Sequence, residues 1–193
     1  TLYSTLSALP RDWKPDYRYK EPTFNYRPIE YHKDMQLEGY FQSFKYFSEY
    51  EDEIRELFLN EKTNLVIEKL RSDFGDLLQK KTASLHIRRG DYLIFNNIHP
   101  QQDLSYYKQS MDYIEADLVF VFSDDIGWCR DNIKMDSLLF VNGQSDYEDM
   151  LLMSLCNHNI ITGSSFSWWG AFLNRNKDKI VVAPKKWFGE GFK

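Results

Sequence analysis

The sequence predicts an α/β fold, a Rossmann-like parallel sheet with crossover helices, and three observations support this prediction. Short apolar runs alternate with helical stretches after residue 81, which is typical of strands joined by helices in a parallel sheet. Polar clusters follow several of these runs, where parallel strands present ligand-binding loops. The 193 residues are 42% hydrophobic, which is enough to bury one sizeable core.

The N-terminal residues differ from the rest in composition. They are aromatic and punctuated by proline, as in "RDWKPDYRYKEPTFNYRPIEYH", and they show no sustained helical or strand period. We expect residues 1–48 to form an irregular, partly extended connecting segment. Residues 49–193 are then expected to form the main domain.

The main domain is expected to begin with a helical lead-in. Between residues 49 and 80, apolar residues recur at helical spacing among charges, which indicates a helical face toward the core. The residues expected on that face are Ile54, Leu57, Phe58, Leu65, Ile67, Leu70, Phe74 and Leu77.

The later elements follow from the alternation of apolar runs and helical patterns. The predicted strands are "ASLHI" (83–87), "DLVFVFSDD" (117–125), "SLLFVNG" (137–143), "NIITG" (159–163) and "KIVVAPKKWF" (179–188). The predicted helices are "LSYYKQSMDYIEA" (104–116), "DIGWCRDNI" (125–133), "DYEDMLLMSLCNH" (146–158) and "SSFSWWGAFLNR" (164–175). Strands that alternate with helices in this way usually pair in parallel.

Charge and cysteine content narrow the functional classes. The formal net charge is -5 with basic residues scattered, so a nucleic acid would find no broad positive surface. Cys129 and Cys156 form neither a CxxC pattern nor a disulfide framework, and we expect both to be free thiols.

No part of the sequence predicts a membrane span or a secretory signal. No apolar run approaches the ~20 residues that a spanning helix needs. We therefore expect a cytoplasmic protein or one peripheral to a membrane, and the C-terminal "KKWFGEGFK" could contact a membrane surface. The chain begins at Thr1 rather than Met, which leaves room for an upstream membrane anchor that is absent from this sequence. With such an anchor, a location in the Golgi lumen would be expected instead.

Three polar clusters are predicted to meet at one edge of the sheet. They are Arg88, Arg89 and Asp91 after the first strand, Ser123, Asp124 and Asp125 after the second, and Gly163, Ser164 and Ser165 before the last helix. Because the carboxyl ends of parallel strands share one edge, we expect these clusters to form a single site.

Only one of the two adjacent arginines can face that site if the strand stays extended. Neighbouring side chains on a strand point to opposite faces. Arg88 would then lie on the face of His86 and Gly90, whereas Arg89 and Asp91 would lie on the other face.

The residue types in these clusters suit a diphosphate. Serines at a helix N-terminus offer hydroxyls, free N–H groups and the positive end of the helix dipole. Arginine adds a planar fork that pairs with phosphate oxygens. Each cluster alone also fits a purely structural role: an ordinary helix cap, a solvated loop, or a structural salt bridge of Asp91.

Several familiar motifs are missing from the sequence. Without a GxGxxG or GxxxxGK[ST] loop, dinucleotide oxidoreductases and P-loop NTPases are disfavoured. Without HExxH or a DxD pair, and with scattered histidines, no metal site is predicted. An adhesive "RGD" is disfavoured too, because it directly follows a buried strand inside a longer motif.

Four motifs in order resemble those of a known enzyme family. They are "HIRRGDY", "FVFSDDIGWCRDNI", "DMLLMSLCNHNIITGSSFSWWGAFLN" and "VVAPKKWF", and they resemble the α-1,2-fucosyltransferases of glycosyltransferase family 11. The upstream "LEGYFQSFKYF" is similar to the segment before the arginine motif in bacterial and viral members. Family members normally open with a glycine-rich "LGNQ" loop in an N-terminal half domain, and this loop does not occur here. The resemblance therefore implies the donor-binding half of a GT-B fold.

The resemblance also implies a reaction and its residues. A metal-independent, inverting transferase would move L-fucose from GDP-β-L-fucose to the 2-hydroxyl of a terminal galactose on an oligosaccharide, with no cofactor besides this donor. Arg88 would hold the departing diphosphate and, with Asp91, carry catalysis. The donor contacts implied are His86, Arg88, Asp91, Asp124, Asn157, His158, Ser164, Ser165, Phe166 and Trp168, with Asn157 and His158 beside the guanine pocket. Asp124 and Asp125 could instead only cap the next helix, and at least one of Trp168 and Trp169 could belong to the core rather than contact a sugar.

Two alternatives to this function stay open. One is another GDP-fucose-dependent enzyme, an α-1,6- or protein O-fucosyltransferase, against which the "SSFSWWGA" box argues. The other is an isolated donor-binding half without activity of its own. A homo-oligomer or a peripheral membrane contact would be compatible with any of these functions.

Overall fold

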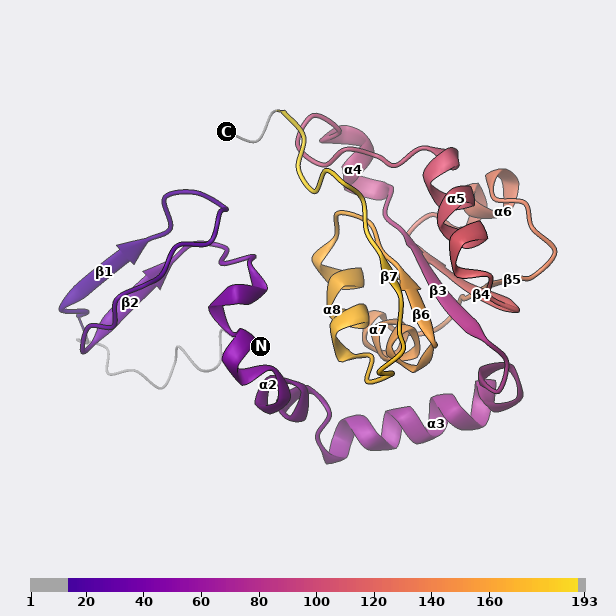
Figure 1. Ribbon diagram of the computed structural model, residues 1–193, viewed down its shortest axis with the longest axis horizontal. Helices are drawn as coiled ribbons and strands as arrows, with labels where there is room; N and C mark the ends of the chain where they lie inside the picture. The colour runs from indigo at the N-terminus through magenta and orange to yellow at the C-terminus, as the bar shows by residue number, and fades with distance from the viewer. Residues whose placement is uncertain (1–13, 191–193) are drawn as a thin grey trace. The chain divides into compact units, whose positions relative to one another are not determined.

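The chain divides into two compact units, Thr1–Arg55 and Glu56–Lys193, in a computed structural model that describes residues 14–190 (Figure 1). Residues 1–13 of the expected connecting segment and residues 191–193 of the C-terminal stretch lie outside the described residues. The boundary between the units falls within helix α2 (Glu51–Phe58).

The first unit contains a two-stranded parallel sheet that the sequence did not predict. Strand β1 (Tyr17–Lys20) pairs with β2 (Met35–Glu38), and Lys20 forms a 3.0 Å ion pair with Glu38. Two short 3-10 turns follow, η1 (Phe44–Tyr46) and η2 (Ser48–Tyr50). Both strands have four residues that are mostly exposed, so no alternation of apolar and polar residues marks them in the sequence.

The helical lead-in is two helices rather than one. Helix α3 (Glu61–Leu78) follows α2 after a break at Asn60, whose side chain accepts hydrogen bonds from the amides of Lys62 and Thr63. The core-facing prediction is correct for Leu70, which is fully buried, but wrong for Leu57 and Leu65, which are 74% and 68% exposed. Leu65 lies two residues before Ile67 of the packed face, which places it about 200° around the helix.

The second unit contains the predicted parallel sheet. Its five strands run in the order β5-β4-β3-β6-β7, and all neighbouring pairs are parallel. The strands are β3 (Thr82–Ile87), β4 (Leu118–Ser123), β5 (Leu138–Phe140), β6 (His158–Ile160) and β7 (Val181–Val182). The chain builds outward from β3 to β5 and then returns to the other side of β3 with β6. This reversal is a topological switch point, where open α/β sheets bind their ligands.

Alternate residues of β4 face two hydrophobic clusters on opposite sides of the sheet. Val119 and Val121 are buried with residues of β3, α5 (Leu104–Ile114) and α6 (Ile126–Asn132). Phe120 and Phe122 are buried with residues of α3 and α7 (Asp146–Leu155). Helix α8 (Ser165–Leu173) packs against α7, and the short helix α4 (Gly90–Ile94) follows β3 (Figure 1).

A capping box fixes the beginning of α7, which borders the site described below. The Ser145 hydroxyl accepts from the amide of Glu148, and the Glu148 carboxylate accepts from the amide of Ser145 at 2.9 Å. Glu148 also pairs with Lys69 of α3 at 2.9 Å. The hydrogen bonds from Ser145 and the pairing with Lys69 lower the pKa of Glu148 to about 2.

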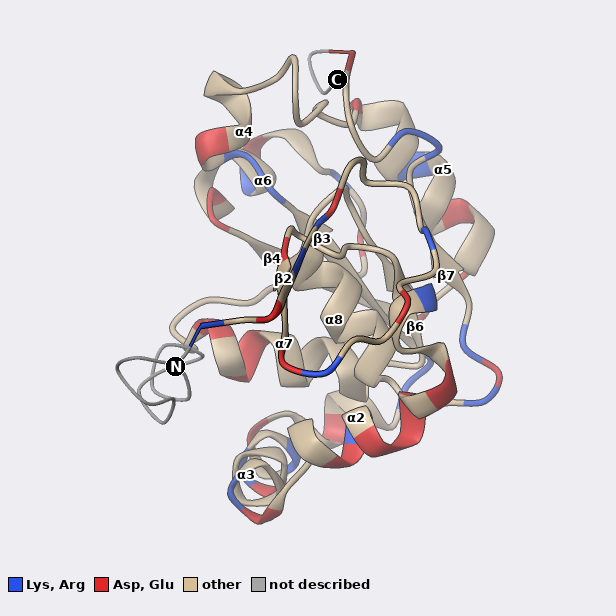
Figure 2. Ribbon diagram, turned by 90° about the vertical axis from the view of Figure 1, so that its left-hand side faces the viewer, with Lys and Arg blue, Asp and Glu red and all other residues tan. Residues whose placement is uncertain are grey.

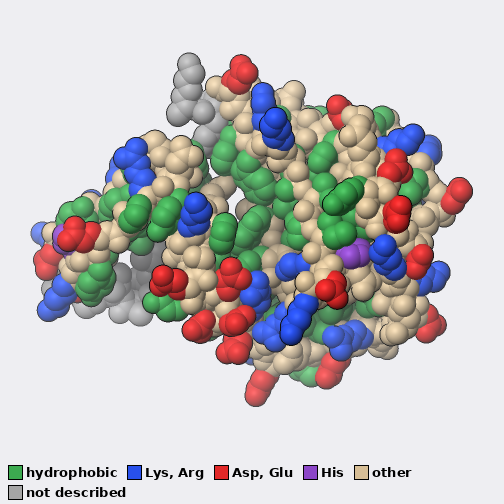
Figure 3. Space-filling view, in the orientation of Figure 1, with side chains coloured by type: hydrophobic (Ala, Val, Ile, Leu, Met, Phe, Trp, Pro, Cys, Tyr) green, Lys and Arg blue, Asp and Glu red, His purple; other side chains and the backbone are tan. Residues whose placement is uncertain are grey.

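Charged side chains of both signs lie on the faces drawn in Figures 2 and 3. Asp and Glu predominate on α2 and alternate with Lys and Arg along α3 (Figure 2). On the face drawn in Figure 3, Lys and Arg are spread among Asp and Glu. Within residues 14–190, no helix is both long and apolar enough to cross a membrane.

Candidate functional site

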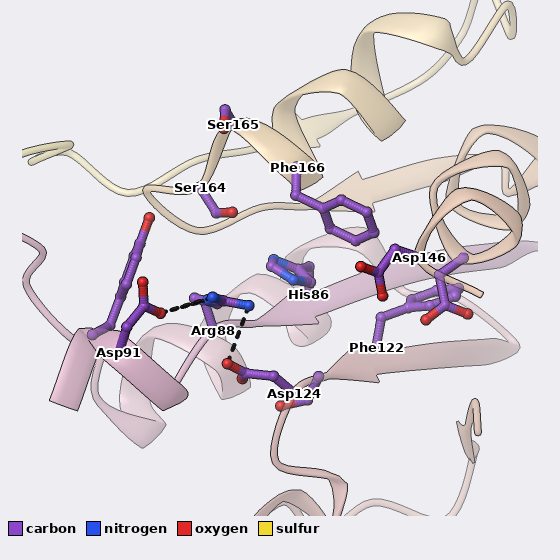
Figure 4. Close-up of a pocket in the computed structure, with 12 residues that line it drawn as sticks. His86, Arg88, Asp91, Phe122, Asp124, Asp146, Ser164, Ser165 and Phe166 are labelled. Atoms are coloured by element: carbon purple, nitrogen blue, oxygen red, sulfur yellow. Dashed lines mark hydrogen bonds and ion pairs between the residues drawn. The ribbon is translucent and has the colours of Figure 1, made fainter. Parts of the chain in front are cut away.

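A pocket of about 320 Å³ opens at the carboxyl ends of β3 and β4, beside the N-terminus of α8 (Figure 4). It is lined by His86, Arg88, Asp91, Tyr92, Phe122, Ser123, Asp124, Asp146, Asp149, Ser164, Ser165 and Phe166. The structure thus brings together residues from all three clusters that the sequence placed at this edge. Figure 4 shows Arg88, Asp91 and Ser164 at one end, Asp146 and Phe122 at the other, and His86 between them.

Arg88 is held between two carboxylates. Its Nε donates to Asp91 Oδ1 at 2.9 Å, and its Nη2 lies 2.8 Å from the same oxygen. Its Nη1 lies 3.2 Å from Asp124 Oδ2. The guanidinium keeps further N–H groups for a ligand, and its side chain is 38% exposed. Arg88 is therefore oriented before any ligand binds.

Asp124 also fixes the backbone that follows β3. Its Oδ1 accepts a hydrogen bond from the amide of Arg89 at 2.9 Å. A Cβ at Gly90 would lie 2.5 Å from the Oδ2 of Asp124, so glycine leaves room for this carboxylate. One side chain therefore holds both the arginine and the turn that presents it.

Arg89 points away from the pocket. Its Nε donates to Asp125 at 3.1 Å, and its guanidinium carbon lies 3.7 Å from the ring centre of Trp128. Asp125 caps α6 by accepting from the amide of Trp128, and this bond, with the bond from Arg89, lowers the pKa of Asp125. The parity argument thus holds for the two arginines. It is wrong for Asp91, because the strand ends at Ile87 and α4 begins at Gly90.

His86 forms part of the pocket floor. It is 4% exposed, and its ring centroid lies 5.3 Å from that of Phe166. Burial, with a smaller effect of Arg88, lowers the pKa of His86 to about 3. The imidazole is consequently neutral in the physiological range, and it contributes shape and a hydrogen-bonding nitrogen rather than charge.

Ser164 precedes α8 without capping it. It has an extended backbone (φ -121, ψ 126), and its side chain makes no capping hydrogen bond. The residue is 5% exposed, and its hydroxyl points toward the interior of the pocket, whereas Ser165 lies on the outer rim (Figure 4). Tyr92 holds this loop in place, since its hydroxyl donates to the carbonyl of Gly163 at 2.9 Å. The Ser164 hydroxyl, which also hydrogen-bonds to that of Tyr92, and the helix end both face the pocket, where they suit an anion.

Two aspartates on the first turns of α7 line the far end of the pocket, and sequence reasoning missed them. Asp149 Oδ1 is buried and has no hydrogen-bond partner among the described residues. Burial, with the nearby charges of Asp146 and Glu148, raises the pKa of Asp149 to about 6. Acidic residues are common in the first turn of any helix, so the sequence carried no signal that set these two apart.

Three of the predicted donor contacts lie outside this pocket. Asn157 accepts from the amide of Thr82 at 2.7 Å, at the amino end of β3, and lines a separate cavity of about 460 Å³. His158 begins β6, and its Nδ1 accepts from the amide of Ile180 at 3.1 Å. Both positions lie at the sheet edge opposite Arg88.

Trp168 is the third residue outside the pocket. Its ring stacks on Phe172 with centroids 5.1 Å apart and planes 14° apart, and it meets Trp169 edge to face. Trp169 in turn packs on Phe58 at 4.7 Å. Both tryptophans are half-buried and take part in the packing of α8, and neither belongs to the two buried core clusters of the described residues.

The described residues form no group of three His, Cys, Asp or Glu side chains arranged to hold a metal ion.

Comparison with known proteins places the chain in a family. Residues 11–193 match glycosyl transferase family 11. The chain is 43% identical over 118 residues to the O-antigen biosynthesis glycosyltransferase WbnK of Escherichia coli, an alignment that covers 55% of this chain and 39% of WbnK. It is 38% identical over 164 residues to an alpha-1,2-colitosyltransferase of Escherichia coli, covering 78% of this chain and 55% of that protein.

A primate protein and a solved structure are also similar. Galactoside alpha-(1,2)-fucosyltransferase 1 of Saimiri boliviensis boliviensis is 31% identical over 159 residues, covering 72% of this chain and 43% of that enzyme. The crystal structure of POFUT1 in complex with GDP superimposes with a TM-score of 0.48 and 13% identity, covering 64% of this chain and 47% of that one. The chain spans about half the length of the curated relatives it matches. With its whole second unit inside the matched range, this chain belongs to glycosyl transferase family 11.

Proposed function

We propose that the pocket binds the nucleotide of GDP-β-L-fucose and that the protein serves inverting transfer of fucose to the 2-hydroxyl of a terminal galactose. Membership of glycosyl transferase family 11 supports a sugar transfer. Two relatives whose names specify an α-1,2 linkage support this regiochemistry. The pocket supports the nucleotide, because its two ends offer different chemistry.

The observation that carries the proposal is the pairing of a cation with an unsatisfied carboxylate in one pocket. Arg88 and the uncapped end of α8 form one end. Asp149 lies at the other, with a buried oxygen that has no hydrogen-bond partner within residues 14–190. A nucleoside diphosphate has the complementary arrangement, with negative charge at one end and N–H donors on its base at the other.

At the first end, Arg88 and Ser164 would hold the diphosphate. In a fucosyl transfer, negative charge grows on the departing GDP while the sugar becomes oxocarbenium-like, so a fixed positive charge there stabilises the transition state more than the ground state. Arg88 is already oriented by Asp91 and Asp124, and little reorganisation would be needed during the reaction.

At the other end, Asp149 would select guanine. Guanine presents an amino group and a ring N–H on one edge, and an ionised carboxylate can accept from both. Phe122 and Phe166 line the same pocket and offer aromatic surface to a flat base. Uracil and adenine lack this pair of adjacent donors, so the same carboxylate would discriminate against them.

A second candidate for the transferred sugar is colitose. The relative that covers most of this chain among those described is an alpha-1,2-colitosyltransferase. Colitose is a fucose without the 3-hydroxyl, so a donor carrying it would use the same nucleotide contacts. The two candidates differ only in whether the protein has a partner for that hydroxyl.

Calorimetric titration with GDP, GDP-fucose, GDP-colitose, UDP and ADP, each with and without EDTA, tests the proposal. GDP and both GDP-sugars are expected to bind without divalent metal, and UDP and ADP about tenfold or more weakly, because the Asp149 carboxylate would be left incompletely paired. Equal affinity for UDP and GDP would overturn the guanine assignment. Binding that disappears in EDTA would overturn metal-independent recognition.

A further inference from the structure

The segment that follows β7, residues 184–190, contacts the loop after α4 and the loop before α8, and we call it the C-terminal strap. The amide of Gly189 donates to the carbonyl of Ile98 at 2.9 Å, in the loop that follows α4. Trp187 meets Gly163, in the loop that precedes α8. Figure 1 shows the strap in yellow, rising from β7 to lie beside α4.

Both contacts are too close for a side chain. A Cβ at Gly163 would lie 2.8 Å from the carbonyl oxygen of Trp187, and a Cβ at Gly189 would overlap the carbonyl oxygen of Asn97. Each obstacle is backbone, which cannot rotate aside as a side-chain tip can. The strap therefore touches the two loops at positions where only glycine permits such an approach.

A chain of aromatic contacts leads from the strap to the pocket. The ring of Phe188 lies 6.1 Å from His99, and His99 stacks on Tyr92 with centroids 4.3 Å apart and planes 13° apart. Tyr92 lines the pocket and donates to the carbonyl of Gly163, the residue before Ser164. The strap is thus connected both directly and through Tyr92 to residues 161–164, the loop between β6 and α8, which we call the Ser164 loop.

The base of the strap is anchored to the same loop. The amide of Ile161 donates to the carbonyl of Val182 at 2.9 Å. The hydroxyl of Tyr106, on α5, donates to the carbonyl of Ile161 at 2.6 Å and lies 3.3 Å from that of Val182. The strap and the Ser164 loop consequently leave the sheet from one fixed point.

The sheet itself does not hold the two phosphate-facing groups together. The ladder between β3 and β6 has its last register pair at Leu85 and Ile160. Arg88 lies three residues beyond Leu85 (88 − 85 = 3), and Ser164 lies four beyond Ile160 (164 − 160 = 4). Their separation therefore depends on contacts made outside the ladder.

We infer that the C-terminal strap is a positioning element of the anion end of the pocket. It holds the loop before α8, which carries Ser164, against α4 and the loop after it, and α4 begins two residues after Arg88. This inference rests on the proposed function only in taking a diphosphate as the ligand. None of the strap residues lines the pocket, so the strap acts through Gly163 and Tyr92.

Gly189→Ala tests the inference, with Gly75→Ala as the matched control, because a Cβ at Gly75 meets nothing within 4 Å. Titration with GDP, guanosine and inorganic pyrophosphate separates the two ends of the pocket. Gly189→Ala is expected to reduce the affinity for GDP and for pyrophosphate about fivefold or more, because a small displacement of a charged partner weakens its interaction strongly. The affinity for guanosine should stay nearly unchanged. Hydrogen exchange should rise in peptides covering residues 92–99 and 161–166, and Gly75→Ala should change none of these quantities.

Unchanged GDP and pyrophosphate affinity in a folded Gly189→Ala protein would overturn the inference, as would an equal loss for guanosine. If Gly189→Ala does not fold, Phe188→Ala provides the same test, and Phe188→Leu should restore part of the lost affinity by refilling the space beside His99. A wild-type protein that binds pyrophosphate but not GDP would refute the guanine assignment alone; a loss of pyrophosphate affinity in Gly189→Ala would then support the inference, and an unchanged affinity would overturn it. A wild-type protein that binds neither would overturn both.

Discussion

One carboxylate oxygen of Asp124 lies 3.2 Å from Nη1 of Arg88. The same oxygen occupies the space that a side chain on Gly90 would need, 2.5 Å from an ideal Cβ. The orientation of the arginine and the absence of a side chain two residues later are therefore linked through Asp124.

Gly90→Ala should consequently weaken GDP binding without unfolding the protein. The obstacle is the tip of a side chain, so the Asp124 carboxylate can move aside, and alanine suits the first turn of α4. Moving Asp124 removes one of the two partners that orient Arg88, and we expect a loss of about threefold to tenfold in GDP affinity. Titration and thermal unfolding, compared with Gly75→Ala, measure the two effects. Unaltered affinity would mean that Asp124 does not prepare Arg88 for the ligand.

Arg88→Lys and Arg89→Lys should affect different properties. Lysine at position 88 loses the planar fork that pairs with two carboxylates and that we propose pairs with the diphosphate, so GDP affinity should fall about tenfold or more. Lysine at position 89 loses the contact with Trp128 and weakens the bond to Asp125, which should reduce the free energy of unfolding by about 1 kcal/mol. Its GDP affinity should stay close to that of the wild type. Similar losses of affinity in both variants would contradict the opposite placement of these side chains.

Ser164→Ala should weaken GDP by about tenfold, since a hydrogen bond to a charged group contributes roughly 1.5 to 3 kcal/mol. Guanosine affinity should not change, because the serine lies at the phosphate end. The melting temperature should change little, because this hydroxyl does not cap α8 and its removal costs only the hydrogen bond to Tyr92. Ser165→Ala is the matched control, with its side chain on the rim. Equal losses for GDP and guanosine would show that Ser164 does not contact phosphate.

Guanosine binding should strengthen as pH rises from 5 to 7. The pKa of Asp149 is raised to about 6, so its carboxyl is mostly protonated at the lower pH and mostly ionised at the upper. Only the ionised form accepts from both donors of guanine, and the gain should approach tenfold as the ionised fraction grows from about a tenth to about nine tenths. His86 does not titrate in this range, since its pKa is about 3.

Asp149→Asn should abolish that pH dependence while the protein stays folded. Guanosine is the better probe than GDP, because a terminal phosphate also titrates near pH ~6 and would mask the effect of the carboxyl. A pH dependence that persists in the variant would assign it to another group and remove the support for guanine selection by Asp149.

The sequence predicted the sheet domain well because burial there follows simple periods. The six residues of β3 are all buried, and the apolar run of β4 is bounded by acids, so both strands stand out. The strands β1 and β2 were missed because exposed side chains on a two-stranded sheet need no pattern. The break at Asn60 was missed because the apolar spacing continues across it, although asparagine is a common N-cap.

Predicted residues at strand ends line the candidate pocket, and predicted residues at strand beginnings do not. Arg88 and Ser164 follow their strands, and both reach the pocket. Asn157 and His158 stand at the start of β6, and parallel strands carry such residues to the opposite edge. Asp149 could not have been recognised, because its distinguishing property is an unpaired buried oxygen, which only the packing of α7 reveals.

The composition of the pocket has a consequence for how fast a nucleotide arrives. Among its lining residues four are aspartates and one is an arginine, and the whole chain has a formal net charge of -5. A diphosphate approaching from a distance therefore meets a repulsive field, and attraction begins only within contact range of Arg88 and the end of α8. Added salt shortens the reach of such a field to about 3 Å at 1 M, so the association rate constant should rise with ionic strength. Most anion sites behave in the opposite way, because their surroundings steer the ligand inward.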